Sequence, residues 1–334
     1  MSMRARMADL RSTLAPVAAG MGVMAAAAAV LVPVLSNAPA VPPRPHDPAP
    51  PRAAVAAPAA TDSTGCTAEN AAESLRPSGA DGDAVKRIKK AGRLVVGVDQ
   101  NSYRWGYRDP DNPRNLIGFD IDLAKAVAED ILGPDPDIVY RAIPTNQRID
   151  AVRQRRVDMV VRTMTINCER KQQVAFSTSY FKAGQQVLAP KRSSIDAFDD
   201  SLRGKKICTA KGSTGEQELK REDHGATVMT VPNQLDCLVR LQLGEADAVV
   251  TDSALAAGQA AQDPTVELKG EPFSTDMYGV AMNKEDEDLV RRVNKVLEEY
   301  REGGADSPWT TAYDKWLKAD LPGVSGPPAP QYSD

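Results

Sequence analysis

Hydroxyl and guanidinium side chains follow the apolar segment 157–161 at short spacing. Thr163 and Thr165 offer hydrogen-bond donors and acceptors, and Arg170 offers a planar guanidinium that can bind a carboxylate through two parallel hydrogen bonds. A strand of a parallel sheet presents such groups to small ligands at its carboxyl end. The pattern therefore indicates a site for a small anion or zwitterion. The alternative is a strand end followed by the solvated start of a helix.

An acidic side chain stands at the corresponding place of a second, similar unit. Segments 149–161 and 235–250 each predict a helix, a tight turn and an apolar strand, and Asp252 follows the second strand as Thr163 follows the first. The echo suggests two similar lobes that direct their strand ends towards one cleft, although any α/β protein can repeat this pattern. One lobe would then offer a cation and hydroxyls, and the other an acid.

Further candidate ligands lie in segment 205–216, where a predicted strand turns at Gly212 and a helix begins. Ser213 and Glu216 have the spacing of a capping box, and the free backbone N–H groups of a helix start bind anions. Ser213 and Thr214 are therefore candidates for capping and for carboxylate binding at once. The segment lacks the GxxxxGK[ST] pattern of a phosphate-binding loop.

The elements that must position these side chains alternate between strands and helices. Phe119, Leu123, Val127 and Ile131 fall on one face of a predicted helix over 119–132. The alternation predicts an α/β fold with a mainly parallel sheet that is covered on both faces. The other predicted helices are 83–90, 147–155 and 286–301, and the predicted strands of this unit are 94–98, 138–140 and 157–161.

Length and composition place the chain among globular proteins. It has 334 residues, of which 42% are hydrophobic and 26% are charged. This is enough chain for roughly two domains. The formal net charge of -4 gives no support to nucleic-acid binding, since that function requires a basic face.

The first residues are typical of a targeting segment. Arg4, Arg6 and Arg11 precede an uncharged apolar run at 14–35, which resembles an export signal and is also long enough to span a bilayer, since that takes about 20 residues. We expect residues 1–38 to be a cleaved signal or a retained membrane anchor, and the body to be extracytoplasmic, at the cell surface or membrane-associated. A Pro/Ala-rich linker over 39–80 and a flexible tail over 321–334 are also expected.

The cysteines indicate disulfides. Export places them in an oxidising compartment, and an even number favours pairing. The chain lacks a CxxC pair, which argues against a zinc site. Three pairings remain open, and the alternative is a set of buried free thiols. The cysteines are Cys66, Cys168, Cys208 and Cys237.

A series of short stretches between about 84 and 318 carries a family resemblance. In chain order they are Gly92-Arg-Leu-Val-Val-Gly-Val-Asp99, Gly118-Phe-Asp-Ile-Asp-Leu-Ala, Arg148-Ile-Asp-Ala-Val, Thr163-Met-Thr-Ile-Asn-Cys-Glu-Arg170, Phe176-Ser-Thr-Ser-Tyr180, Lys211-Gly-Ser-Thr214, Asp247-Ala-Val-Val-Thr-Asp252, Tyr278-Gly-Val-Ala and Tyr313-Asp-Lys-Trp-Leu. Together they resemble family 3 of the solute-binding proteins of ABC transporters, which bind polar amino acids. The likeness is greatest to the actinobacterial glutamate- and glutamine-binding type.

The resemblance implies a two-lobe, periplasmic-binding-protein-like fold of type II, with two crossing hinge strands. Residues 84–183 plus 278–320 would form the first lobe and 184–277 the second. It further implies a monomer that needs no cofactor, closes on an amino acid and delivers it to an ABC permease.

The resemblance also implies roles for single residues. Arg170 would bind the ligand α-carboxylate, with help from Thr165 and the helix start at Ser213 and Thr214. Asp252 would bind the α-ammonium, with Thr163 beside it. Either Tyr103 or Trp105 would contact the ligand, or both would belong to the core or rim of a lobe. The implied disulfides are Cys208–Cys237 and Cys66–Cys168, and the second would stiffen the loop that carries Arg170.

The remaining charged candidates bear on the ligand side chain. Several cations favour a carboxylate side chain, whereas Asp99 would suit the amide of glutamine or asparagine. We therefore expect glutamate or aspartate, with glutamine or asparagine as the close alternative. Any single arginine could instead be a solvated surface group. The cations are Arg104, Arg148, Arg162 and Lys211.

Two other functional classes remain as alternatives. An enzyme is one of them, because a fold alone does not exclude catalysis, but the chain shows no GxSxG, HExxH or cofactor fingerprint. A sensor that reports an amino acid to a membrane signalling partner is the other, and a retained anchor would favour it. The sequence does not separate sensing from import.

Overall fold

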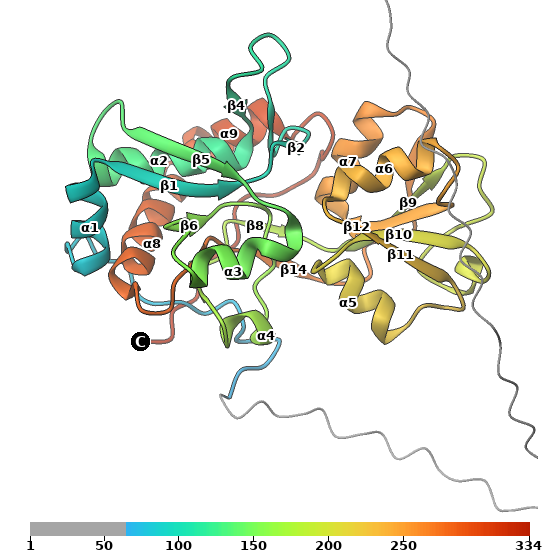
Figure 1. The fold of residues 1–334 in the computed structure, drawn as a ribbon, viewed down its shortest axis with the longest axis horizontal. Helices are drawn as coiled ribbons and strands as arrows, with labels where there is room; N and C mark the ends of the chain where they lie inside the picture. The colour runs from blue at the N-terminus through green and yellow to red at the C-terminus, as the bar shows by residue number, and fades with distance from the viewer. Residues whose placement is uncertain (1–64) are drawn as a thin grey trace, which may run out of the picture. The chain divides into compact units, whose positions relative to one another are not determined.

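The computed structural model describes residues 65–334, which build two five-stranded sheets and the helices packed on them (Figure 1). The predicted signal or anchor segment 1–38 and positions 39–64 of the predicted linker lie outside these residues. Within 65–334, no helix combines the length and apolar character that crossing a membrane requires.

The first sheet has the strand order β5-β1-β6-β15-β7. Strand β1 pairs in parallel with β5 and β6, and β15 pairs antiparallel with β6 and β7. Leu94, Val96 and Val98 alternate along β1 and are fully buried, as expected for an apolar strand with a neighbour on each side. We call the part of the chain around this sheet the first lobe. Its strands are β1 (Arg93–Val98), β5 (Asp137–Ala142), β6 (Met159–Val160), β7 (Ala175–Phe176) and β15 (Ala281–Met282).

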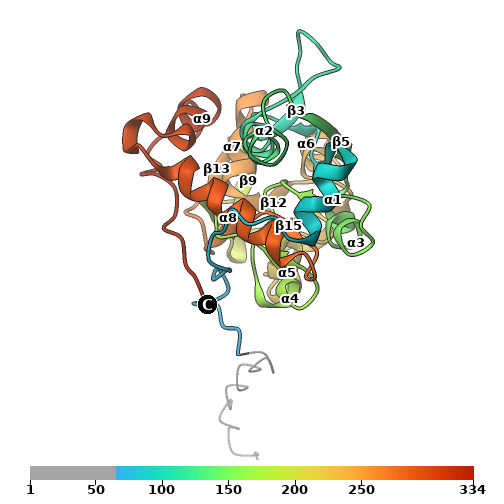
Figure 2. The same ribbon diagram turned by 90° about the vertical axis from the view of Figure 1, so that its left-hand side faces the viewer.

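Helices cover the first sheet (Figure 2), and the helical periodicity read from the sequence is confirmed by α2. Phe119, Leu123, Val127 and Ile131 are all buried on its inner face. The helices are α1 (Asp83–Ala91), α2 (Phe119–Leu132), α3 (Arg148–Arg153), α4 (Cys168–Lys171), α8 (Glu287–Arg301) and α9 (Pro308–Trp316), with 3-10 turns η1 (Thr145–Gln147) and η3 (Gly304–Asp306). A small sheet joins β2 (Asn101–Ser102), β3 (Gly106–Arg108) and β4 (Leu116–Ile117).

The second sheet has the order β11-β10-β12-β9-β13 and defines the second lobe. Strand β10 is parallel to β11 and β12, whereas β9 is antiparallel to β12 and β13. The elements are β9 (Gln185–Pro190), η2 (Asp200–Leu202), β10 (Lys206–Ala210), α5 (Thr214–Arg221), β11 (Thr227–Val231), α6 (Gln234–Gln242), β12 (Ala248–Asp252), α7 (Ser253–Gln262) and β13 (Val266–Lys269).

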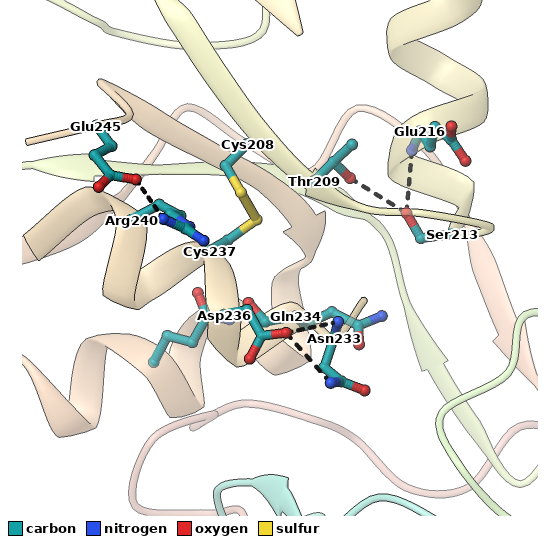
Figure 3. Close-up of a disulfide and its surroundings, with 11 residues drawn as sticks. Cys208, Thr209, Ser213, Glu216, Asn233, Gln234, Asp236, Cys237, Arg240 and Glu245 are labelled. Carbon is teal, nitrogen blue, oxygen red and sulfur yellow. Dashed lines mark hydrogen bonds and ion pairs between the residues drawn. A yellow bond between two sulfur atoms is a disulfide. The ribbon is translucent and has the colours of Figure 1, made fainter. Parts of the chain in front are cut away.

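A disulfide fastens helix α6 to the second sheet (Figure 3). Cys208 on β10 and Cys237 on α6 are both fully buried, with their Cα atoms 5.5 Å apart. Asn233 and Asp236 form a capping box at the start of α6, so the helix is held at its first turn as well.

Two antiparallel strands connect the lobes. They are β8 (Phe181–Ala183) and β14 (Asp276–Tyr278), and they pair with each other. Just after β8 the backbone passes so close to Ser274 that a Cβ on Gly184 would lie 2.2 Å from the Ser274 carbonyl oxygen. Only glycine fits at this crossing.

The two ends of the described chain pack on the first lobe. Ser74 is buried, donates to the Phe176 carbonyl at 2.7 Å and forms a β-bridge with Tyr332. Asp334 accepts a hydrogen bond from the backbone of Arg76. Residues 65–80 of the expected linker and the end of the expected tail 321–334 therefore differ from the sequence-based expectation. The polar side chain of Asn294 explains part of this, since it donates to both Ser74 and the Leu75 carbonyl.

Candidate functional site

The loop after β6 carries Thr163 and Thr165 and is held in an uncommon conformation. Thr163 has a φ of 40°, a region that side chains other than glycine rarely adopt. Its N–H donates to Asp120 Oδ2 at 3.0 Å, and the Tyr180 hydroxyl donates to Asp120 Oδ1 at 2.8 Å. Burial raises the pKa of Asp120 to about 7. Strained backbone that its surroundings hold in place is typical of ligand sites.

Arg170 lies on the short helix α4, where the Asn167 side chain caps the first turn by accepting from the Arg170 N–H at 2.9 Å. Its guanidinium is buried and donates to two carbonyl oxygens, that of Thr165 at 2.6 Å and that of Gly212 in the second lobe at 3.1 Å. Within residues 65–334 no carboxylate pairs directly with it. Burial lowers the pKa of Arg170, and the more distant Asp252 and Asp276 oppose that shift.

Arg148, at the start of α3, is buried beside Arg170. It donates to the carbonyl oxygens of Thr145 at 3.0 Å and Arg162 at 3.1 Å, and reaches Gly212 at 3.5 Å. Burial lowers its pKa well below the usual range, and the charges of Arg170 and Arg162 add to that effect. Gly212 thus offers one carbonyl to two cations, and a carboxylate in its place would be a stronger acceptor.

Arg162 and Asp99 form an ion pair in the cleft, and both side chains are buried. Arg162 Nη2 lies 2.7 Å from Asp99 Oδ2. Asp99 also accepts from the Ser102 hydroxyl at 2.9 Å and from the Gln100 N–H at 2.7 Å. Asp99 is therefore satisfied by neighbours on its own lobe, and its charge is neutralised by Arg162.

The acidic side of the cleft is built differently. Asp252 ends β12 and is buried, and it accepts from Gln185 Nε2 at 3.0 Å. Asp276, at the start of β14, accepts from the same nitrogen at 2.7 Å. Burial raises the pKa of Asp252, the neighbouring Asp276 charge raises it further, and the Tyr278 hydroxyl partly opposes the rise. The side chain that joins these acids, Gln185, was not among the residues singled out from the sequence.

Contacts across the cleft join the two lobes directly. The hydroxyls of Thr165 and Thr214 lie 3.4 Å apart, and Gln217 Nε2 donates to Glu169 at 2.7 Å. The Thr145 hydroxyl donates to Gln234 at 3.0 Å. The lobes are therefore close enough for both to contact one small molecule.

Several predicted residues have other roles in the structure. Ser213 caps α5, accepting from the Glu216 N–H at 3.1 Å (Figure 3), while the Glu216 carboxylate accepts from Gly212. Lys211 is exposed beside this turn. Arg104 pairs with Asp320 at 3.2 Å, so the structure does not bring it to the other cations.

The aromatic candidates contribute mainly to packing. Trp105 is 1% exposed and packs edge-on against Phe119 and Phe181, with ring centroids 5.4 and 4.8 Å apart. Its indole N–H donates to the Ala254 carbonyl at 3.2 Å across the cleft. Tyr103 is partly exposed, and the Arg104 guanidinium lies over its ring.

A cavity of about 120 Å³ opens beside the guanidinium groups of Arg148 and Arg170 and is bounded by Gly212 from the second lobe. A larger cavity of about 680 Å³ lies between α2, α8 and α9, but none of the candidate residues lines it. Among the described residues, no group of three His, Cys, Asp or Glu side chains is arranged to hold a metal ion.

The sequence around Gln185 and Asp276, the two residues that sequence reasoning missed, gives little sign of their role. Gln185 opens an apolar strand and Asp276 stands two residues before Tyr278, in a stretch that the family resemblance covers only from Tyr278 onward. Their meeting depends on the crossing of β8 and β14, which sequence spacing does not report.

Comparison with known proteins agrees with this architecture. The model of the bacterial extracellular solute-binding proteins, family 3, matches residues 94–319. The glutamine-binding protein GlnH of Bacillus subtilis is 33% identical over 262 residues, which cover 78% of this chain and 92% of that protein. The glutamine-binding protein of Geobacillus stearothermophilus is 35% identical over 236 residues, which cover 71% of this chain and 89% of that protein. These relatives are named as binding proteins.

Solved structures show the same arrangement of lobes. A mutant of the arginine-binding protein of Thermotoga maritima superposes with a TM-score of 0.65 at 32% identity, covering 71% of this chain and 100% of that one. An ancestral arginine-binding protein bound to glutamine gives a TM-score of 0.62 at 36% identity, covering 68% and 98%. The predicted two-lobe, type II fold is confirmed. The chain belongs to the bacterial extracellular solute-binding proteins, family 3.

Proposed function

We propose that this protein is an extracytoplasmic receptor that closes on an acidic amino acid and delivers it to an ABC permease. One observation carries the proposal. Buried cations of the first lobe, Arg148 and Arg170, face buried acids, Asp252 and Asp276, across one cleft, and the cations and acids are not directly paired with each other among the described residues. A zwitterion supplies both missing partners.

The ligand ends would be read by opposite sides of the cleft. Arg170 binds the α-carboxylate, assisted by Thr165 and by Thr214 and Ser213 at the start of α5. Asp252 binds the α-ammonium, with Thr163 beside it. In this arrangement the α-carboxylate takes over the hydrogen bond that the Gly212 carbonyl accepts from Arg170.

The ligand side chain would face Arg148, Arg162 and Asp99. Because Asp99 neutralises Arg162, Arg148 is left as the surplus cation, and it favours a side-chain carboxylate. Glutamate or aspartate is therefore the preferred ligand. Arg104 pairs with Asp320 and is therefore left out of the proposed selectivity residues. Lys211 is exposed beside the turn at Gly212 and stays a proposed selectivity residue.

Glutamine is the second candidate, and a specific observation favours it. The adjacent Arg162 guanidinium and Asp99 carboxylate offer a donor and an acceptor side by side, which matches the carbonyl and the NH₂ of a side-chain amide. The relatives from Bacillus subtilis and Geobacillus stearothermophilus are also named for glutamine.

Calorimetric titration of the purified full chain with glutamate, aspartate, glutamine, asparagine, arginine and histidine tests the proposal. We expect micromolar or tighter binding of glutamate or glutamine and at least tenfold weaker binding of arginine. Tight arginine binding with none for glutamate or glutamine would contradict it. Recovery of the bound amino acid unchanged would separate this function from that of an enzyme, a possibility raised by an ancestral relative named as a precursor of cyclohexadienyl dehydratase.

The cellular role needs its own test. We propose 84–183 plus 278–320 and 184–277 as the two lobes of a monomer that meets the permease while its N-terminal segment keeps it at the membrane. Deleting the gene should abolish uptake of the radiolabelled ligand by intact cells. Unchanged uptake, together with a lost transcriptional response to that amino acid, would instead assign the protein to sensing.

A further inference from the structure

Gln185 joins three groups that come from three other elements. Its Nε2 lies 3.0 Å from Asp252 Oδ1 on β12, 2.7 Å from Asp276 Oδ2 on β14 and 2.9 Å from the Thr214 hydroxyl on α5. Gln185 itself is fully buried at the start of β9. An amide NH₂ has two hydrogens, so it cannot donate fully to all three acceptors.

The rest of this cluster is also incompletely matched. Gln185 Oε1 is buried and has no hydrogen-bond partner among the described residues. The oxygen is held tightly, since a Cβ on Gly215 would lie 2.9 Å from it. A buried amide oxygen without a donor is unfavourable, and such a group in a native protein calls for an explanation.

The two carboxylates face each other with no directly paired cation among the residues that the structure describes. Asp276 is buried and accepts from the Ser274 hydroxyl at 3.1 Å as well as from Gln185. Burial raises its pKa, and Glu218 on α5 adds to the rise. The positive charges that act on the pair, Arg170 on α4 and Arg148 on α3, do so from a greater distance. Tyr278 completes the groups around Asp252.

Two like charges that share one buried donor cannot both ionise without cost, and a carboxyl group can avoid that cost by keeping a proton. We propose that Asp276 is a positioning residue for ligand recognition: with Gln185 and Asp252 it forms one unit that keeps a proton in the ligand-free protein and gives it up when the ligand ammonium enters. The ammonium then supplies the positive charge in place of the proton, which passes to solvent. The inference rests on the proposed amino-acid-binding function and deepens it.

The unit lies beside the two hinge strands. Gln185 follows the first crossing strand and Asp276 opens the second, so both side chains lie at the hinge and not on either lobe's outer surface. Gln185 and Asp252 are partners in the register of β9 and β12, and Asp276 opens β14, so their contact at one nitrogen is made where the second lobe meets the hinge. An ammonium bound there would hold that arrangement.

The test measures how many protons the protein releases when the ligand binds. The full chain is titrated with glutamate and with glutamine at pH 6.5 in buffers of different ionisation enthalpy, and the affinity is then measured from pH 5 to pH 8. The wild type should release a fraction of a proton approaching one on binding. Its affinity should fall up to tenfold per pH unit below the midpoint of that titration, since one pKa unit corresponds to a factor of 10. Glutarate, which lacks the ammonium, should release none.

Variants assign the effect to Asp276. D276N should bind more weakly and release fewer protons, and the midpoint of its affinity loss should move down by about one pH unit, because removing a like charge favours the ionised form of Asp252. D158N is the matched control. Asp158 is partly buried and accepts from the Val95 N–H at 2.9 Å in the first lobe, away from the cleft, so its loss should leave proton release unchanged.

The outcomes separate the two proposals. If the wild type binds neither probe nor any other amino acid, the proposed function and this inference both fail. If it binds without proton release, or if D276N loses affinity with an unmoved pH profile, the inference alone is overturned and Asp276 is merely structural. Should D276N not fold, the comparison of glutamate with glutarate on the wild type still tests whether entry of the ammonium releases a proton, and equal release with both would overturn the inference.

Discussion

The two sides of the cleft solve the problem of buried charge in different ways. On the cationic side, Arg148 and Arg170 donate to backbone carbonyls, and Arg162 pairs with Asp99. On the acidic side, Asp252 and Asp276 share one amide. The difference follows from chemistry. A guanidinium stays protonated in proteins and needs acceptors, whereas a carboxyl group can bind a proton and become neutral.

The two ends of a bound zwitterion would therefore replace different groups of the ligand-free protein. A ligand carboxylate would replace the Gly212 carbonyl of the second lobe as the acceptor of guanidinium hydrogen bonds. An ammonium would take the place of a proton. Selectivity for a zwitterion then requires both exchanges, so each side of the cleft can be tested separately.

The largest effect should come from the cationic side. R170A should weaken glutamate or glutamine binding by more than about 100-fold, since truncating one partner of a buried, hydrogen-bonded charge pair costs about 2–5 kcal/mol. R170K should also weaken binding strongly, because an ammonium lacks the planar fork. Calorimetry measures both. R104K is the control, since Arg104 pairs with Asp320, and wild-type affinity in R170A would refute the assignment.

On the acidic side, D252N should reduce affinity by roughly 30-fold or more and yet stabilise the ligand-free protein above neutral pH. The folded-state pKa of Asp252 is raised, mainly by burial. Its stabilising contribution is therefore present at pH values below about 4 and is lost as pH rises through the raised value, so the ionised form costs stability at pH 8. Thermal unfolding at pH 5 and pH 8 measures this.

Asp120 calls for the matching control, because its pKa is also raised, to about 7, while it binds the Thr163 loop. D120N should flatten the same pH dependence of stability without abolishing binding. If D252N proved less stable than the wild type at pH 8, the account of the acidic side would be wrong.

The contact between the two sides is tested by G212A, with an expected loss of affinity of about tenfold, the equivalent of about 1.4 kcal/mol. Gly212 has a φ of 78°, and a Cβ there would lie 2.9 Å from the Asn146 Cα in the first lobe. The change should hinder closure, so small-angle scattering with ligand should show a more open molecule. G244A, also at positive φ but with open space around it, controls for backbone strain alone.

The two disulfides give the smallest and most local contrast. The first disulfide joins Cys66 to Cys168, which is two residues before Arg170. The second, Cys208–Cys237, lies in the core of the second lobe. Replacing Cys66 and Cys168 by alanine should weaken binding about threefold, roughly 0.7 kcal/mol, because α4 loses its anchor. Replacing Cys208 and Cys237 should lower the melting temperature with an unchanged affinity, since removing a native disulfide costs about 2–5 kcal/mol. Equal effects of both on affinity would contradict the positioning role of the first.

Much of the fold could be predicted from local patterns. The helix over 119–132 follows from its apolar spacing, and the structure ends it at Leu132. The two expected disulfides join the same cysteines that the structure pairs. The expected tail was misjudged, because the short segment around Tyr332 gains its order from Ser74, which is more than two hundred residues away in the chain.

The candidate site divides in the same way. Residue type and family resemblance pointed to Arg170, Arg148, Thr165 and Asp252, which the structure brings to one cleft. Their ligand-binding roles remain predictions. The pairing of Asp99 with Arg162 was not foreseen, and it changes which cation is available to a ligand side chain.

Side-chain type and short-range spacing were enough to indicate the family, the main strands and helices of the first lobe and the residues able to carry charge. Only the fold shows that Asp99 neutralises Arg162 and that Gln185 joins Asp252 to Asp276. Those outcomes depend on distances between strands that are remote in the chain, and the crossing at the hinge sets them.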